Sequence, residues 1–516
     1  MKYNLVIVVF VFFLLWSNNT TIAKNSAYNP LDYGLASASN GEERFWVLYH
    51  THELAKKNNS KVSYEGVGSI EIDIPFNAPS IPLSSYTDFC DLVLTVGCNY
   101  DNYVLFEFTQ NVSEIPINKF SIDNGTYKDY PELAKGLYLL QLVDENLWVK
   151  QRVGFDYGHQ RMDVVLVKDG KAKNKTVFPY NNDETNLTAK YCKVTPEKKQ
   201  FKNIVFRRKQ GNAKIASLLL IDHQFNVNLD NISIFTPSDT LYADQAIIVV
   251  NSNNIVFNNI IIEGTYSRPD AYGYGITMNN VYGVKFYKLY GRASWGIFGN
   301  NNINNVALKE CDINRFDVHC YGRDIVFENC SFHDLYNQFS SINGTVVFSN
   351  CSFFDFIPFQ YETTYNAYTR FDLTFNNCTV YASKEKNYLI DARGILGIET
   401  DERSELKFQC YPNLIISGLT VHAENVTKSY YVYNQGWNIL TKRGKIPGVI
   451  KIKKVNVISN GEKGELKLGT IDAVLSELKT GAFIIGGATC GGLCLYANRK
   501  KKKKDKQSLI NEIGTM

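Results

Sequence analysis

Five short segments of the sequence repeat one pattern: VKFYKLYG (284–291), VALKECDI (306–313), IVFENCSF (325–332), VVFSNCSF (346–353) and LTFNNCTV (373–380). Their starting points lie 19 to 27 residues apart, and apolar and polar residues alternate within each segment. A polar pair then marks a corner, followed in register by Leu289, Cys311, Cys330, Cys351 and Cys378. Short strands of period two cannot each bury a face alone, so this spacing predicts that they stack as coils of one parallel β-solenoid.

The pattern continues toward the N-terminus in ASLLLIDHQ, NVNLDNISIF, QAIIVVNSNNIVFNNIIIEG and YGITMNN, and it is clearest over residues 204–425. Long amphipathic helices are nearly absent, which favours an all-β chain with a single solenoid over residues 24–479. Asparagines at the corners are expected to stack as side-chain ladders. The cysteine column is expected to stack as small inward apolar residues, because parallel Cβ vectors give poor disulfide geometry.

Two longer stretches carry a resemblance. Asn29 to Lys57, NPLDYGLASASNGEERFWVLYHTHELAKK, followed by KVSYEGVGSIEIDIP, is similar to the start of the pectate-lyase-like superfamily, with a capping helix before the first coil. Ala293 to Cys330 contains W-G-I-x-G and R-F-D-x-H, and looks like an uncharacterised branch of right-handed parallel β-helix proteins. The resemblance covers about residues 29–460 and implies the fold. It does not imply one activity, because this superfamily holds lyases, hydrolases, epimerases and non-catalytic adhesins.

The segment NRFDVHC offers the clearest chemistry. With Phe316 and Val318 inward, Arg315, Asp317 and His319 lie on the outer face of one strand, roughly 7 Å apart at about 3.4 Å per residue. These three residues are the predicted catalytic group, with Asp317 or His319 as acid or base and Arg315 on the charge of an anionic sugar. The predicted substrate-binding residues are Arg323 at the next turn and, on the next coil, Asp334, Tyr336 and Gln338. The competing interpretation is an outward ion pair that merely satisfies itself.

The function expected from this wall is engagement of a polysaccharide, with cleavage by a lyase or glycoside hydrolase as one alternative. A non-catalytic adhesin or receptor and a rigid stalk are the others; an adhesin predicts a shallow aromatic strip. The D-D pair and the G-H-G motif of polygalacturonase-type hydrolases do not occur. No acidic cluster stands out as a calcium site, so calcium stays an open cofactor, and no Cys/His spacing suggests zinc.

Composition excludes several protein classes. The chain has 516 residues, of which 45% are hydrophobic and 21% charged, values that exclude a disordered or collagen-like protein. The net charge of +4 arises at the ends, because the part between leader and tail has 47 basic and 49 acidic residues. A nucleic-acid partner is therefore not expected, since it would need a basic surface on the folded body.

Both ends resemble targeting segments. Residues 1–23 have a basic start, an apolar run and a small-residue site, which predicts a cleaved secretory signal peptide. Residues 480–497 carry no charge and precede a block of lysines, so a type I transmembrane helix with a basic cytoplasmic tail, residues 498–516, is expected. The alternative is a buried terminal helix. Within the tail, Asp505 to Ile510 (DKQSLI) resembles an acidic dileucine signal for a sorting adaptor, which predicts a cell-surface or endosomal and lysosomal membrane location.

An extracytoplasmic location permits disulfides and glycans. Cys90 and Cys98 flank an apolar strand-like segment and are predicted to form a local disulfide. Eleven N-x-S/T sequons follow the leader, including Asn329, Asn350 and Asn377 at the solenoid corners. Glycosylation is predicted at the other eight: Asn58, Asn111, Asn124, Asn174, Asn186, Asn231, Asn343 and Asn425.

Overall fold

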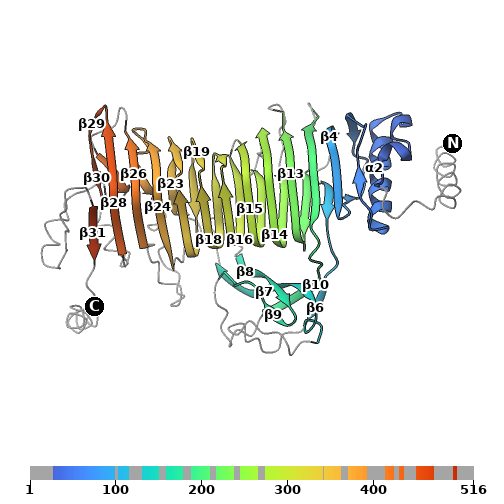
Figure 1. Ribbon diagram of the computed structural model, residues 1–516, viewed down its shortest axis with the longest axis horizontal. Coiled ribbons are helices and arrows are strands. Elements are labelled where there is room, and N and C mark those ends of the chain that lie inside the picture. The colour runs from blue at the N-terminus through green and yellow to red at the C-terminus, as the bar shows by residue number, and fades with distance from the viewer. Residues whose placement is uncertain are drawn as a thin grey trace, which may run out of the picture.

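The chain folds into one long stack of strands with a helix at its N-terminal end, as the computed structural model shows (Figure 1). The structure describes residues 27–98, 103–115, 131–149, 159–177, 187–209, 217–237, 245–264, 273–293, 295–340, 342–361, 370–391, 413–423, 429–434, 449–469 and 492–496. Within these ranges, 26 strands form one continuous sheet and five form a second, smaller sheet.

The strands of the large sheet are β1 (Val62–Ser63), β2 (Ser69–Asp73), β3 (Ile81–Pro82), β4 (Tyr86–Gly97), β5 (Val104–Phe108), β11 (Lys199–Arg208), β12 (Ser217–Asp222), β13 (Phe225–Phe235), β14 (Gln245–Gly264), β15 (Tyr274–Ala293), β16 (Gly296–Lys309), β17 (Asp312–Ile313), β18 (Phe316–Glu328), β19 (Ser331–His333), β20 (Tyr336–Phe339), β21 (Ile342–Ser349), β22 (Ser352–Phe354), β23 (Ile357–Tyr361), β24 (Arg370–Tyr381), β25 (Tyr388–Asp391), β26 (Asn413–His422), β27 (Ser429–Tyr433), β28 (Val449–Ser459), β29 (Glu462–Lys463), β30 (Glu465–Lys467) and β31 (Gly492–Tyr496).

Successive coils pair in parallel and in the register that the repeats predict. Phe286, Leu308, Phe327, Phe348 and Phe375 occupy the same position in consecutive coils. All five side chains are fully buried, and the rings of Phe327 and Phe348 stack with centroids 4.7 Å apart. Each coil thus buries its inward residues against the coils above and below, and the predicted solenoid with one continuous core is confirmed.

The corners explain the asparagines. One corner holds residues in the left-handed backbone region, among them Asn203, Asn231, Asn259, Asn329, Asn350 and Asn377, with φ between 49° and 62°. Asparagine tolerates this conformation better than other residues with a Cβ. Asn231 Nδ2 donates to Asn203 Oδ1 (3.1 Å), and Asn259 Nδ2 donates to Asn231 Oδ1 (3.0 Å), so the predicted ladder forms in these coils.

The cysteines follow the same logic. Cys311, Cys330, Cys351 and Cys378 are buried thiols in one inward column, as predicted. The predicted disulfide between Cys90 and Cys98 is wrong, because both residues are thiols, Cys90 exposed and Cys98 buried. Strand β4 runs extended from Leu92 to Gly97 between them, which separates their Cα atoms by about 20 Å, whereas a disulfide needs less than about 7 Å.

Helix α2 (Gly41–Lys57) closes the N-terminal end of the stack, as the resemblance implies, after two short 3-10 turns, Pro30–Tyr33 and Leu35–Ser37. Asn40 caps it by accepting a hydrogen bond from Glu43 N, and Glu43 Oε2 accepts one from Ser39 N at 2.7 Å. The side chains of Phe45 and Leu48 are fully buried against the first coils, which shields the open end of the core from water.

Acid is expected to weaken this cap through His52. The ring is fully buried, its Nε2 lies 2.8 Å from Tyr64 Oη, and burial lowers the pKa of His52 to about 3. The unfolded chain takes up a proton below about pH 6.5 and the folded chain does not, so stability falls as the pH drops through that window. Between pH 7 and pH 5 we expect His52 to account for a loss of about 2 kcal/mol, measured by urea unfolding. His52→Gln should remove most of this pH dependence; an unchanged pH dependence would contradict the assignment.

The second sheet was not predicted from the sequence. Its strands, in the order β6 (Ser113–Ile115), β10 (Leu187–Lys193), β7 (Leu137–Val149), β8 (His159–Lys168) and β9 (Lys171–Ala172), are antiparallel. They are inserted between β5 and β11 and lie against one side of the stack (Figure 1). A small apolar cluster that includes Leu139, Val164 and Cys192 packs against Phe225 and Tyr282 of the solenoid. The predicted single domain therefore carries an inserted small sheet.

The predicted C-terminal transmembrane helix is not confirmed. Of residues 480–497, the structure describes 492–496, which form strand β31 antiparallel to β28. Among the described residues, no helix has the length and apolar character needed to cross a membrane. The predicted signal peptide, the tail and the Asp505–Ile510 motif lie outside the described residues.

Candidate functional site

The structure brings the three predicted catalytic residues together at the start of β18. Arg315 Nε donates to Asp317 Oδ1 at 2.7 Å, and Arg315 Nη2 donates to Gln338 Oε1 on the next coil at 2.5 Å. The side chains of Arg315 and Asp317 are only 2% and 0% exposed. The two charges therefore satisfy each other, as in the competing interpretation of the sequence, but the ion pair is buried and does not lie at a solvated surface.

Two aromatic rings enclose the guanidinium of Arg315. Its Cζ lies 4.2 Å from the ring centroid of Trp295 and 4.4 Å from that of Tyr336. Trp295 precedes Arg315 in the chain, and Tyr336 follows it on the next coil. Burial disfavours the charged guanidinium, but Asp317 outweighs this effect and raises the pKa of Arg315. The charge is thus already neutralised inside the protein, so the predicted role of Arg315 in binding a sugar carboxylate is not what this geometry provides.

Tyr274, the first residue of β15, joins Asp317 to His319. Its hydroxyl lies 2.9 Å from Asp317 Oδ2 and 2.9 Å from His319 Nε2, and it accepts a hydrogen bond from Trp295 Nε1 at 3.1 Å. A carboxylate only accepts, so the phenol donates to Asp317. The two lone pairs of the phenol oxygen are then available to Trp295 and to a protonated Nε2 of His319.

This order of donors assigns the tautomer of His319. With Nε2 as donor, the neutral ring carries its lone pair on Nδ1. Burial, and then the charge of Asp317, raises the pKa of Tyr274 well above its ordinary value near 10, so the phenol stays protonated. The His319 side chain is 17% exposed and Tyr274 is also partly exposed, whereas Asp317 is fully buried.

A β-bulge places His319 at this point. In the pairing of β16 with β18, Asn300 is opposite Val318 and Asn301 is opposite Cys320, which leaves His319 as an extra residue. The strand backbone is held nearby by Asn300 Nδ2, which donates to the carbonyl of Asp317 at 2.8 Å. Simple alternation put His319 on the same face as Asp317, but it could not show that a bulge aims the ring.

Two glycines of W-G-I-x-G make room for the group. A Cβ at Gly296 would lie 2.9 Å from a side-chain carbon of Arg315, and a Cβ at Gly299 would lie 2.4 Å from a ring carbon of Tyr274. The motif therefore supplies a tryptophan for the guanidinium and two gaps for the neighbouring side chains. Sequence reasoning missed Tyr274 and Trp295. The W-G-I-x-G motif was a signal for Trp295, but Tyr274 lies 43 residues before Asp317, and no local pattern links the two.

The predicted substrate-binding residues divide into two groups. Tyr336 and Gln338 lie at the site, where both contact Arg315. Asp334 does not, because it has a left-handed backbone (φ 70°) at the corner after β19, where its carbonyl accepts from Lys386. Arg323 lies beyond the next corner and donates to the carbonyls of Thr176 and Val177, so its predicted place at this site is wrong.

An aromatic strip occurs elsewhere on the solenoid. His333, Phe354, Tyr381 and His422 occupy one register position in successive coils. Their rings stack with centroids 4.7 to 4.9 Å apart and planes within 10° of parallel. Since each ring covers the faces of its neighbours, the strip presents edges outward and offers little face area for stacking on a sugar.

Metal and glycan predictions have the following outcomes. Within the described ranges, no group of three or more His, Cys, Asp or Glu side chains could hold a metal ion. Asn124, Asn186 and Asn425 lie outside the described residues. Asn111 is exposed, and Asn58 Nδ2 donates to Tyr28 Oη at 2.7 Å. The amide nitrogens of Asn174, Asn231 and Asn343 also donate within the protein, to Val164 O, Asn203 Oδ1 and Val177 O.

The comparisons with known proteins concern the fold. No protein-family model matches the sequence, and no curated protein matches it either. Among solved structures, the tailspike protein gp49 from Pseudomonas phage LKA1 superposes with a TM-score of 0.59 at 13% identity, covering 86% of this chain and 78% of that one. This likeness shows the fold, a right-handed parallel β-helix.

Two further structures are more distant. The Pseudomonas phage phi297 tailspike gp61 has a TM-score of 0.44 at 12% identity, covering 87% of this chain and 81% of that chain. The gp54 tailspike of Acinetobacter baumannii bacteriophage AP22, solved with a capsular saccharide, has a TM-score of 0.40 at 11% identity, covering 83% of this chain and 79% of that chain.

We expect Gly299→Ala to disrupt this part of the β-helix selectively. The new methyl group would overlap the Tyr274 ring, so the ring must shift away from Asp317 and His319, at a cost of about 1–3 kcal/mol in unfolding free energy. The change should appear as altered tyrosine signals in the near-ultraviolet circular dichroism spectrum. Thr277→Ala, in register with Gly299 on the preceding coil, is the control. Unchanged Tyr274 signals in Gly299→Ala would contradict the packing.

Proposed function

We propose that the protein engages a polysaccharide along the wall that carries Tyr274 and His319, and that His319 acts there as a general base. The observation that supports this most strongly is the hydrogen-bonded chain from buried Asp317 through Tyr274 to partly exposed His319. The same constellation would be costly to maintain in a rigid stalk, because it buries an ion pair.

The chain can support proton transfer in a defined way. Nδ1 of His319 takes a proton from the substrate or from a water molecule, and the imidazolium that forms keeps its Nε2 hydrogen bond to Tyr274. Asp317 Oδ2 lies 3.7 Å from Nε2 and stabilises that positive charge. Asp317 is thus a positioning residue in this proposal, since its oxygens bond to Arg315 and Tyr274.

A panel assay tests the proposal. The full chain is incubated with acidic and neutral polysaccharides, and new reducing ends and absorbance at 235 nm are followed, with binding measured in parallel on a glycan array. Reducing ends with absorbance indicate elimination, and reducing ends without it indicate hydrolysis. Binding without turnover would contradict the catalytic role of His319 and leave a glycan-binding wall. The absence of both binding and turnover across the panel would overturn the proposal.

The location is proposed from the sequence alone. Residues 1–23 act as a leader, residues 480–497 anchor the chain, and Asp505–Ile510 contacts a sorting adaptor. The anchored chain should stay in the membrane pellet after alkaline carbonate extraction, and a variant that ends at residue 479 should be released. Release of the full chain by carbonate would instead favour the pairing of β31 with β28.

A further inference from the structure

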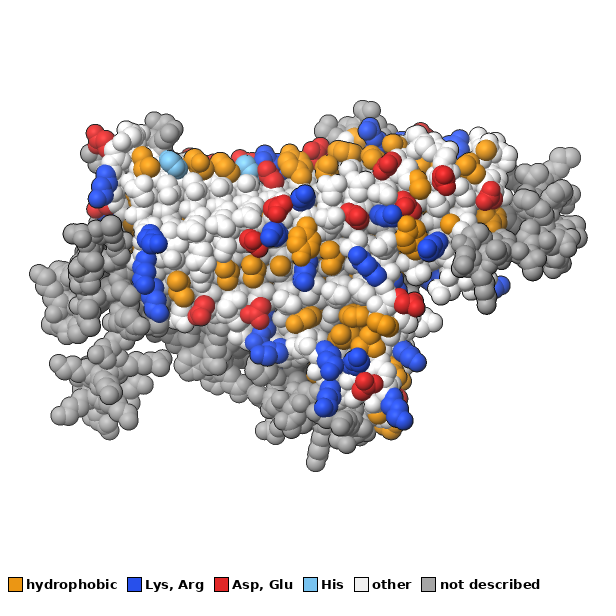
Figure 2. All heavy atoms as spheres, viewed as in Figure 1, with side chains coloured by type: hydrophobic (Ala, Val, Ile, Leu, Met, Phe, Trp, Pro, Cys, Tyr) orange, Lys and Arg blue, Asp and Glu red, His pale blue; other side chains and the backbone are white. Residues whose placement is uncertain are grey.

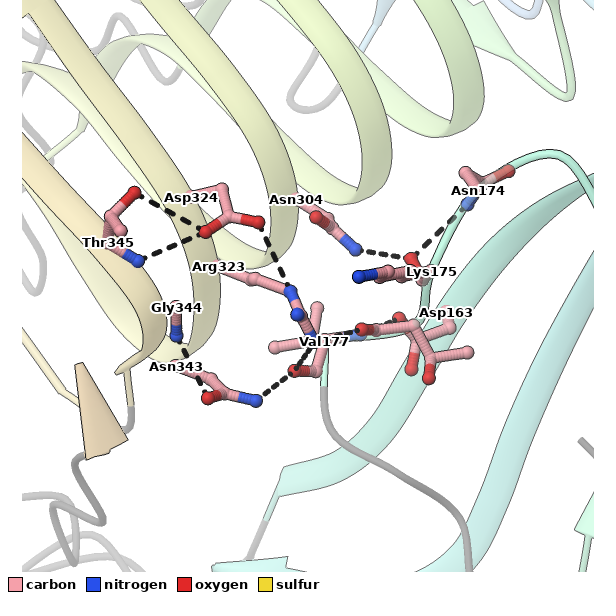
Figure 3. Close-up of polar contacts among 11 residues, drawn as sticks. Asp163, Asn174, Lys175, Val177, Asn304, Arg323, Asp324, Asn343, Gly344 and Thr345 are labelled. Atoms are coloured by element: carbon pink, nitrogen blue, oxygen red, sulfur yellow. Dashed lines mark hydrogen bonds and ion pairs between the residues drawn. The ribbon is translucent and has the colours of Figure 1, made fainter. Parts of the chain in front are cut away.

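A short segment of the inserted domain lies across the turns of the solenoid. Residues 174–177, which we call the strap, follow β9 and are held mainly by their backbone carbonyls (Figure 3). Asn304 Nδ2 donates to Lys175 O at 2.6 Å, and Asn343 Nδ2 donates to Val177 O at 2.9 Å. Between them, Arg323 Nη1 donates to Thr176 O at 3.2 Å and to Val177 O at 3.4 Å.

The donors come from one column of the β-helix. Asn304, Arg323 and Asn343 occupy the same register position on β16, β18 and β21. Each coil thus offers one outward donor, and the strap runs along the stack so that successive carbonyls meet successive coils. Such a column of N–H donors can bind an extended polymer through the regularly spaced acceptor oxygens of its backbone.

Arg323, the central donor of the column, can bind a carboxylate more tightly than it binds the carbonyls of the strap. Arg323 also pairs with Asp324 at 3.2 Å, and its side chain is 20% exposed, so its remaining N–H groups donate to neutral carbonyls at the surface. A carboxylate would form shorter, charge-assisted hydrogen bonds with the same guanidinium, about twice as strong as those to a neutral carbonyl. The geometry therefore favours exchange of the strap for an anionic chain.

The surroundings are basic. Figure 2 shows lysine and arginine side chains gathered over the small sheet, next to the solenoid. The exposed lysines of the small sheet include Lys168, Lys171, Lys173, Lys175, Lys190 and Lys193, against the exposed acidic residues Asp169 and Glu114, the latter paired with Lys190. Several like charges on one surface raise the local concentration of a polyanion and accelerate its association.

We propose that the column of Asn304, Arg323 and Asn343 is a second binding site for an acidic polysaccharide, and that the strap occupies this site until the polymer displaces it. The inference rests on the proposed engagement of polysaccharide, but it does not rest on turnover. The polymer class is carboxylate-bearing sugars. The segment released by binding is the strap, which leaves both the column and Asp163 of the small sheet.

Hydrogen exchange of the full chain tests the exchange directly. In the docked strap, Val177 N donates to Asp163 Oδ1 at 2.6 Å, which protects its amide. Sodium polygalacturonate at low salt is expected to raise the exchange rate of the peptide covering residues 174–177 about tenfold, while dextran leaves it unchanged. Exchange in β26, which carries no residue of the wall or of the column, should stay constant in both cases, which separates strap release from unfolding.

Variants complete the test. Arg323→Gln should expose the strap without polymer and abolish the response to polygalacturonate, and Arg323→Lys should keep a weaker response. His319→Gln should respond like the wild type, so a failure of the proposed catalysis leaves this result intact. Unchanged or slower exchange with polygalacturonate, or an equal response to dextran, would overturn the proposal.

Discussion

Replacing Asp317 with asparagine is expected to lower the free energy of unfolding by about 3–5 kcal/mol, because it leaves the buried Arg315 guanidinium without its counter-charge. The aromatic rings of Trp295 and Tyr336 and the amide of Gln338 remain, but none of them carries a negative charge. Chemical denaturation of the purified chain, followed by tryptophan fluorescence, measures the loss. An activity loss in this variant would therefore not identify Asp317 as catalytic.

A matched surface pair provides the control. Arg292 and Asp312 form an ion pair at 3.1 Å, but their side chains are 38% and 36% exposed. Asp312→Asn should cost no more than about 1 kcal/mol, because water screens the remaining charge. The double variant Arg315→Met with Asp317→Leu should regain most of the stability lost in Asp317→Asn, since no unpaired charge remains. Equal losses in Asp317→Asn and Asp312→Asn would show that burial does not govern the pair.

Replacing His319 with glutamine is expected to reduce kcat about 10²–10⁴-fold on any polymer that the panel identifies, because the proposed general base is removed. The unfolding free energy should change by less than about 1 kcal/mol, since the side chain reaches the surface and lies outside the apolar core. KM should stay close to the wild-type value, because the contacts that bind the substrate equally in the ground state and the transition state are not altered. A kcat within twofold of the wild type would remove His319 from the mechanism.

Two further variants separate proton transfer from packing. Added imidazole should restore part of the activity of His319→Ala, as it supplies the missing base, whereas a merely structural histidine would not respond. Tyr274→Phe should also lower kcat, because Asp317 and His319 lose the phenol that links them. Its unfolding free energy should fall by about 1–3 kcal/mol, the cost of leaving buried partners unsatisfied.

Much of the fold could be predicted from the sequence because the signals are local. Alternation in VVFSNCSF fixes which side chains point inward, and the recurrence of the pattern fixes the register of Phe327, Phe348 and Phe375. The corner asparagines follow from the left-handed backbone that each corner needs. None of these features depends on distant parts of the chain, since a solenoid coil contacts mainly the next coil.

The candidate site was predicted only in part. Alternation correctly brought Tyr336 and Gln338 to the wall with Arg315, but it took Arg315 and Asp317 as solvated groups. Their burial depends on Trp295 and Tyr274, which the preceding coils contribute, and on glycines that let those rings approach. Alternation also failed at Asp334, where a left-handed residue interrupts the strand.

The sequence by itself thus determined the stack of parallel coils and its inward column, because each repeat carries the periodicity and the corner residues. The helical cap was implied by the resemblance of residues 29–57. Only the tertiary structure decided which polar groups are charged partners, which residue is aimed outward by a bulge, and that Arg323 holds the strap of an inserted sheet. The physical reason is that hydrogen bonds and ion pairs between coils depend on offsets of a few ångströms between segments far apart in the chain, and no local pattern encodes such offsets.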